Sequence, residues 1–187
     1  MLEEKRRAKR KYIASKCCDM FVKSGFDNIS ISKIAANAGI GKGTVYEYFK
    51  NKEDIVFELM TCLQETYDKK FKQKFATAKT KYEKALTLFD FFINQEEEIQ
   101  ILREIYKQFL IVCLTNPSDE ILNYNTKLRS KYINILNEII DDIEVSSNLY
   151  DSIVGYFIAY HSLENYDLEF QIKNIIKKEL IDKEKTD

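Results

Sequence analysis

The sequence contains no tryptophan, one proline and five glycines in 187 residues, so few residues would interrupt a helix. It also lacks any run of about 18 apolar residues, the length that a transmembrane helix needs. Residues Met1 to Lys11 are rich in charge and no apolar segment follows them, so we expect no secretion signal. With 45% hydrophobic and 32% charged residues, the composition is typical of a soluble, helix-rich protein, which we expect in the cytoplasm.

Histidine and cysteine are too few and too scattered for most catalytic or metal sites. His161 is the one histidine, and the four cysteines show no CxxC spacing. The sequence has no GxGxxG or GxxxxGK loop and no nucleophile with an evident base, so we expect no enzymatic activity, metal or cofactor. Cys17 and Cys18 would point about 100° apart on a helix, which disfavours a mutual disulfide. Ordinary buried thiols are favoured, with a redox sensor as the alternative.

Charge is distributed unevenly along the chain. Although the net charge is −1, residues 1–52 contain twelve Lys or Arg and five Asp or Glu. Residues 53–187 contain 17 bases and 25 acids. The basic segment is therefore the candidate surface for a polyanion, whereas the acidic remainder would repel DNA.

The spacing of apolar residues predicts three helices in the basic segment, over 3–24, 31–38 and 42–49. Gly25 and Gly39 stand where C-terminal capping glycines belong. Two short helices joined by a glycine-containing turn form a helix-turn-helix, and the long first helix completes its core.

All remaining segments are also helical by periodicity, and no strand is needed. The expected helices cover 52–75, 79–94, 96–115, 118–145, 147–165 and 167–183. The charged tail Lys183 to Asp187 is expected to fray. The predicted fold class is therefore all-α.

The third helix has the chemistry of a DNA-recognition helix, which enters the major groove with its N-terminal residues first. Gly41 and Gly43 remove side chains where the backbone would approach DNA. Lys42 and Thr44 can reach base edges or phosphates, and tyrosine hydroxyls can donate to phosphates.

The stretch from Ile29 to Ile55 resembles the DNA-binding signature of the tetracycline-repressor (TetR) family of bacterial regulators. The matching residues are Ala38, Gly39, Gly43, Thr44, Val45, Tyr46, Tyr48, Phe49, Lys52 and Glu53. By position, this resemblance implies DNA contacts from Ser30, Ser32, Lys42, Gly43, Thr44, Tyr46, Tyr48 and Lys52. It further implies a DNA-binding domain over 1–52 and a helical ligand-binding and dimerisation domain over 53–187.

Two alternatives remain open within this segment. Glu47 occupies a position that is often aromatic or basic in relatives, and it could accept a hydrogen bond from cytosine or point away from the groove. The second is favoured because phosphates repel a carboxylate. Either Tyr46 or Tyr48 could pack its ring against the first helix while its hydroxyl still contacts DNA.

Most of the 24 tyrosines and phenylalanines lie in the C-terminal segment, where they could line a ligand site. A packed aromatic core is the favoured reading for any single ring. The candidate ligand-binding residues are Phe89, Phe92, Tyr106, Phe109 and Tyr156.

The helix expected over 147–165 is apolar nearly all round, so it needs a second partner surface. The following helix offers an apolar stripe, and the two could form a four-helix interface with a second copy, as the family's last two helices do. The candidate interface residues are Ile153, Gly155, Tyr160, Leu163, Ile172 and Ile176. His161 is expected to be a satisfied core or interface residue.

Together these features predict a homodimeric repressor that binds a palindromic double-stranded DNA operator and responds to a small-molecule effector, without a membrane partner. The sequence identifies neither the effector nor the operator. The competing hypothesis is an all-helical adaptor whose basic end binds proteins or anionic surfaces without reading DNA sequence.

Overall fold

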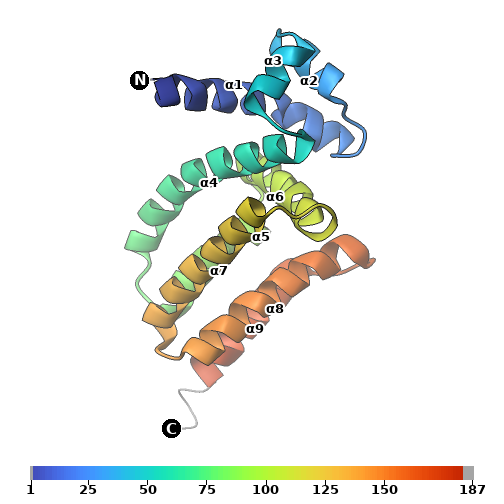
Figure 1. The fold of residues 1–187 in the computed structure, drawn as a ribbon. Helices are drawn as coiled ribbons and strands as arrows, with labels where there is room; N and C mark the ends of the chain where they lie inside the picture. Colours follow the sequence, from blue (N-terminus) through green and yellow to red (C-terminus); the bar gives the residue numbers. More distant parts are fainter. Residues whose placement is uncertain (1, 183–187) are drawn as a thin grey trace. The chain divides into compact units, whose positions relative to one another are not determined.

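The computed structural model describes residues 2–182, and its regular structure throughout that range is helical, as predicted (Figure 1). By packing, these residues form two compact units. The first comprises residues 2–68 with 96–122, and the second comprises 69–95 with 123–182. The two packing units do not coincide with the two functional domains expected over 1–52 and 53–187. Those domains were defined by what each segment binds, and they stay a prediction.

The first unit is built on a helix-turn-helix. Helix α1 (Leu2–Ser24) packs against α2 (Ile31–Ala38) and α3 (Lys42–Tyr48). Gly25 and Gly39 follow α1 and α2 with φ of 72° and 67°, left-handed values that favour glycine. Both predicted helix ends are confirmed.

The core of this unit comes from the predicted inward faces. Ile13, Cys17 and Phe21 of α1 have no exposed surface, and Val45 and Phe49 are each 1% exposed. Burying such side chains stabilises a fold by about 1.5–3 kcal/mol each. Short helices such as α3 gain most of their stability from this packing.

Two further helices contribute to the first unit, α4 (Lys52–Thr77), which continues into the second unit, and α6 (Glu97–Thr115). The rings of Phe57 in α4 and Phe109 in α6 stack with centroids 6.5 Å apart. The buried Gln108 of α6 accepts a hydrogen bond from the backbone N–H of Phe26 at 2.9 Å. Helix α6 therefore supports the turn that leads from α1 to α2.

The second unit joins the end of α4 to four helices and a terminal π-helical turn. These are α5 (Lys81–Ile93), α7 (Asp119–Ile140), α8 (Ile143–Ser162), α9 (Leu168–Lys177) and η1 (Lys178–Asp182). Helix α9 packs against α5 and α8. The rings of Tyr132 and Tyr150 stack at 6.1 Å between α7 and α8, and Phe92 meets Phe157 at 5.2 Å between α5 and α8.

The expected break between the helices predicted over 118–145 and 147–165 is misplaced. The first of them ends at Ile140, because Asp141 adopts a left-handed φ of 61°, and the next begins at Ile143. Asp142 then caps α8 by accepting hydrogen bonds from the N–H groups of Glu144 and Val145, both at 3.0 Å. The tail 183–187, expected to fray, lies outside the described residues.

Within residues 2–182, no helix combines the length and the apolarity needed to cross a membrane. The same residues contain no group of three or more His, Cys, Asp and Glu side chains arranged to hold a metal ion.

Candidate nucleic-acid interface

Helix α3 presents its N-terminal residues to solvent. Lys42 and Gly43 are exposed and Thr44 is half-buried, while Val45 and Phe49 fix the opposite side of the helix in the core. The structure therefore brings together on one exposed end the three residues that the sequence assigned to the major groove. This is the geometry that a recognition helix requires.

Packing within the chain does not require glycine at position 41 or at position 43. A Cβ atom added at Gly43 would meet nothing within 4 Å, and one added at Gly41 would lie 3.8 Å from Thr44 Oγ1, an ordinary contact. The space beside Gly43 is therefore free to receive another molecule.

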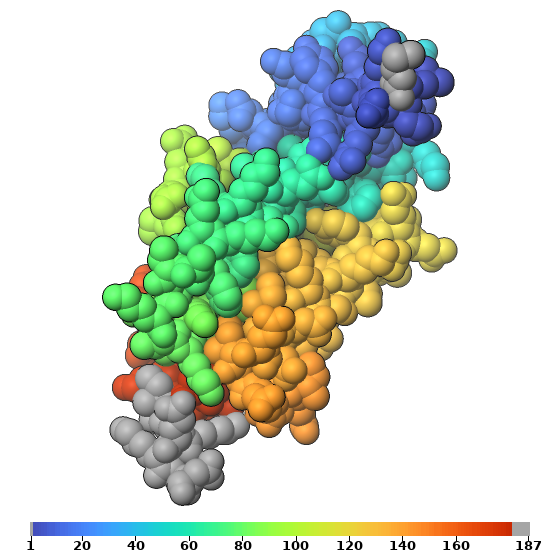
Figure 2. Space-filling model, turned by 90° about the vertical axis from the view of Figure 1, so that its left-hand side faces the viewer, coloured from blue at the N-terminus to red at the C-terminus, as the bar shows by residue number. Residues whose placement is uncertain are grey.

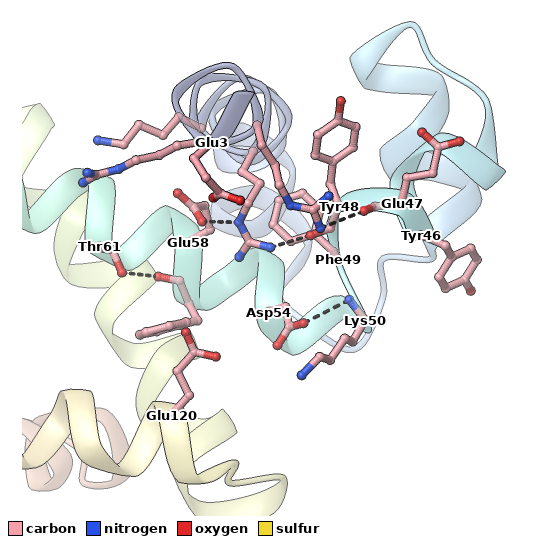
Figure 3. A pocket seen from close by; sticks show the side chains of 15 residues that line it. Glu3, Tyr46, Glu47, Tyr48, Phe49, Lys50, Asp54, Glu58, Thr61 and Glu120 are labelled. Atoms are coloured by element: carbon pink, nitrogen blue, oxygen red, sulfur yellow. Dashed lines mark hydrogen bonds and ion pairs between the residues drawn. The ribbon is translucent and has the colours of Figure 1, made fainter. Parts of the chain in front are cut away.

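The two tyrosines of α3 have different environments. Tyr46 is 52% exposed, whereas Tyr48 is half-buried with the Arg6 guanidinium of α1 5.5 Å from its ring centroid. Figure 3 shows the two rings pointing away from each other. Tyr48 is thus the ring that packs toward α1, and Tyr46 is free to reach outward.

Glu47 is exposed, and its carboxylate makes no ion pair among residues 2–182. Figure 3 shows the Glu47 and Tyr46 side chains leaving α3 in different directions. Both alternatives for Glu47, base contact or orientation away from the groove, remain predictions.

The other predicted DNA contacts are placed less uniformly. Ser30 and Ser32 are exposed at the start of α2, where Ser30 Oγ accepts from the Lys33 N–H at 3.3 Å and keeps its own proton to donate. Lys52 is half-buried instead, and its ammonium donates to the Phe26 carbonyl at 2.6 Å and lies 4.0 Å from the Phe26 ring centroid. Lys52 therefore holds the turn after α1, and a phosphate contact would require its remaining protons.

Two arginines of α1 also belong to this region. From the sequence they were recognised only as part of the net positive charge of residues 1–52. Arg6 and Arg10 donate to the backbone carbonyls of Glu47 and Tyr48, at the end of α3. They border an open pocket of about 550 Å³ lined from α1, α3, α4 and the start of α7, which carries charges of both signs (Figure 3). The four-residue spacing of these arginines was the available signal.

The cysteines lack the properties of redox sensors. Burial, with a smaller contribution from Cys18, raises the pKa of the Cys17 thiol from 9.0 to about 12. Burial likewise raises the pKa values of Cys62 and Cys113, each to about 11. Cys17 is buried and the other three cysteines are partly exposed. Reactive thiols need a lowered pKa, so the raised pKa values favour ordinary thiols over redox sensors.

The residues proposed to line a ligand site are divided between the units. Phe89, Phe92 and Tyr156 lie in the second unit, and Tyr106 and Phe109 lie in the first. All except the half-buried Tyr156 are less than 9% exposed. Their assignment to a ligand stays a prediction, because burial serves a packed core equally well.

Three of the six proposed interface residues are corrected by the structure. Ile153, Ile172 and Ile176 have no exposed surface within one chain, so they cannot bury more against a second copy. The apolar stripe of α9 faces α5 and α8 of its own unit instead. Gly155, Tyr160 and Leu163 are exposed, as an interface would require.

A helix-turn-helix with an exposed, cation-bearing second helix defines a class of DNA-binding protein. Comparison with known proteins narrows this class. A sequence model described as "Bacterial regulatory proteins, tetR family" matches residues 15–59, which cover the C-terminal part of α1, all of α2 and α3, and the beginning of α4.

The relatives extend beyond the matched segment. The fatty acid metabolism regulator protein of Bacillus subtilis is 29% identical over 143 residues, 74% of this chain and 70% of its own length. The transcriptional regulator QacR of Staphylococcus aureus is 23% identical over 174 residues, 83% of this chain and 87% of its own. The crystal structure of FadR from B. subtilis with stearoyl-CoA superposes with a TM-score of 0.66 at 19% identity, covering 91% of this chain and 97% of that one.

In its helix-turn-helix segment, residues 15–59, the chain belongs to the TetR family of bacterial regulatory proteins, and it is a DNA-binding transcriptional regulator. Its family is one of regulators and not of enzymes, in agreement with the expectation from the sequence.

Proposed function

We propose that this regulator is a ligand-responsive repressor that binds a palindromic operator as a homodimer. The observation that carries the proposal is the exposed end of α3, where Lys42, Gly43 and Thr44 are available to a DNA groove while the rest of the helix is anchored in the core. Ser30, Ser32 and Tyr46 supply further exposed donors for phosphates.

A second copy is the partner that the exposed side of α8 fits. Along this helix Asp151, Gly155, Ile158 and Ser162 are exposed at alternating spacings of four and three residues, the spacing of a helix–helix seam. Ile158 is 52% exposed and Leu163 58% exposed, so this side of α8 leaves apolar surface that a partner could bury. A twofold axis through such a seam would give two recognition helices for two half-sites about 34–36 Å apart.

The effector proposed for this chain is a ligand with a long apolar part. This class is suggested by the relatives, because the FadR structure contains stearoyl-CoA and the curated B. subtilis relative is a fatty acid metabolism regulator. Preference of such a ligand for a conformation with differently spaced recognition helices would release the operator.

The first experiment selects bound sequences from a random duplex pool at about physiological salt, where non-specific attraction is reduced. A palindromic consensus is expected. Failure to enrich any sequence with a folded protein would contradict the proposal and favour the adaptor hypothesis.

The selected duplex then tests the individual assignments. Tyr46→Ala should weaken binding to all sequences, whereas Lys42→Ala and Thr44→Ala should also change base preference. Unchanged affinity in all three variants would exclude α3 as the recognition helix.

The dimer is tested separately by Ile158→Asp, which would place a charge in the seam and should give a monomer in analytical ultracentrifugation. Lys177→Asp on α9 is the matched surface control. Stearoyl-CoA added to the wild-type complex should release the duplex, and no effect of acyl-CoA would contradict the proposed effector class.

A further inference from the structure

The end of α3 is held by side chains from α1. The last carbonyls of a helix have no partner within the helix, and cations are favoured there. Arg6 donates to the Glu47 carbonyl at 3.0 Å, and Arg10 donates to the Tyr48 carbonyl. Two arginines one turn apart on α1 therefore cap two successive carbonyls of the recognition helix.

Arg10 also binds α4. Its Nε donates to Glu58 Oε2 at 2.7 Å, and its guanidinium lies 4.4 Å from the centroid of the Phe49 ring. The Arg10 and Glu58 side chains are 24% and 13% exposed, so water screens this ion pair less than a surface pair. Figure 3 shows dashed contacts at Glu58 and at the end of α3 near Tyr48.

Neighbouring cations of α1 have other partners. Arg7 and Lys11 bind the carboxylate of Glu65 in α4, at 2.9 and 2.6 Å. Lys9 lies 5.1 Å from the Tyr12 ring centroid. Among residues 2–182, these three cations make no hydrogen bond or ion pair to α3, although the N-terminal part of α1 is broadly exposed (Figure 2). Arg10 is distinguished by joining α1, α3 and α4 at one guanidinium, which a planar group with five donors can do and an ammonium cannot do equally well.

We propose that Arg10, held by Glu58, is a positioning residue for operator recognition, which fixes the orientation of α3 without contacting DNA. Helix α3 has seven residues and is about 10 Å long, so a 10° tilt about its C-terminal end would displace its N-terminal end by about 2 Å. Hydrogen bonds to bases tolerate only tenths of an ångström. This proposal rests on the proposed function, because it requires that the protein binds a specific DNA sequence.

The test compares Arg10→Met and Arg10→Lys with Lys9→Met, which removes a charge at the adjacent position without a contact to α3. Affinity is measured for the palindromic duplex recovered by selection and for a scrambled duplex, over a range of salt concentrations. Arg10→Met should lose about tenfold in affinity for the selected duplex, the equivalent of one charge-assisted hydrogen bond, with little change for the scrambled one. Arg10→Lys should recover part of this loss, and Lys9→Met should leave the ratio of the two affinities unchanged.

Other roles for Arg10 give different results. A direct phosphate contact would lower both affinities and reduce the salt slope by about one. A purely structural role would lower the unfolding temperature while leaving the ratio of the two affinities at its wild-type value. Either result would overturn the proposal.

Glu58→Gln keeps the shape of the side chain and weakens its hold on Arg10, so it should reduce the same ratio by a smaller factor. In a double-mutant cycle, Arg10→Met and Glu58→Gln should be non-additive, because they break one network. Additive losses would contradict the joint role.

Hydrogen exchange of the free protein tests whether Arg10 holds α3 without requiring an operator. The amides of α3 should exchange faster in Arg10→Met than in Lys9→Met, and equal rates would refute the positioning role. If the wild-type protein selects no duplex, the proposed function fails, while the exchange result still decides whether Arg10 holds α3.

Discussion

Aromatic side chains are used differently in the two compact units. In the first unit, Tyr46 of the recognition helix exposes 52% of its surface. In the second unit, Phe89 and Phe157 are each 1% exposed and pack between helices. Buried rings such as Phe21 and Phe49 also form the core of the first unit, so the difference is that the first unit additionally carries an exposed ring on its recognition helix. Composition gives the number of aromatic residues. Whether a given ring is buried or exposed depends on the helix that carries it and on the side of that helix.

A related contrast concerns charge. The cations of α1 that face α3 and α4 have partners within the first unit, as Arg10 has in Glu58 and Lys11 has in Glu65. Lys42 at the start of α3 has no ion-pair partner among the described residues. A basic segment is therefore not a uniform DNA-binding surface, because paired cations are less available to phosphates.

The largest effect is expected from removing a core aromatic of the second unit. Phe157→Ala should destabilise the protein by about 3–5 kcal/mol, because it deletes a ring packed against Phe92 and leaves a cavity. Urea unfolding at fixed protein concentration measures this loss. Phe170→Ala, at a position that is 59% exposed, is the control and should change stability by less than about 0.5 kcal/mol. Equal effects would break the contrast between core and surface aromatics.

A smaller and opposite effect on stability is expected at Gly43. Alanine fits the free space there and favours the helix, so Gly43→Ala should stabilise the free protein by about 0.4–1 kcal/mol. The added methyl group should nevertheless weaken operator binding, on the order of tenfold, if the backbone approaches DNA at this point. Thermal unfolding and duplex titration measure the two quantities. A stabilised variant with unchanged DNA affinity would show that the free space does not receive DNA.

The smallest effect at neutral pH is expected for the cysteines. Since burial raises the pKa of Cys17 from 9.0 to about 12, the folded chain keeps a proton that the unfolded chain loses above about pH 9. The stability linked to this proton is complete below pH 9 and is lost as the pH rises toward 12. Alkylation by iodoacetamide at pH 8 should therefore be slow without denaturant.

Cys17→Ala is the control for this pH dependence, because it should remove the contribution of the thiol to the slope of stability above pH 9. Rapid alkylation of the folded wild-type protein, or release of DNA by mild oxidants, would restore the redox-sensor hypothesis.

Local signals in the sequence predicted much of the first unit. Gly25 and Gly39 end α1 and α2 with left-handed φ, as expected from glycine positions alone. The helix-turn-helix and the inward positions of Val45 and Phe49 follow from spacing within a few residues. Helix propensity, capping and periodicity are short-range effects, so a single sequence is sufficient to show them. The break at Asp141 was missed because no glycine or proline marks it, although aspartate is one of the few non-glycine residues that adopt a left-handed φ with some frequency.

Tertiary structure decided which side chains become partners. Lys52 binds the carbonyl of Phe26, and Arg10 joins α3 to Glu58 of α4, over separations of 26 to 48 residues. Ile172 and Ile176 face their own unit and leave the side of α8 with Ile158 exposed. The sequence by itself determined the fold class, the position of the recognition helix and the family, because these depend on local patterns. Only the packed structure showed which cations and which apolar faces have partners, because those contacts join helices that are distant along the chain.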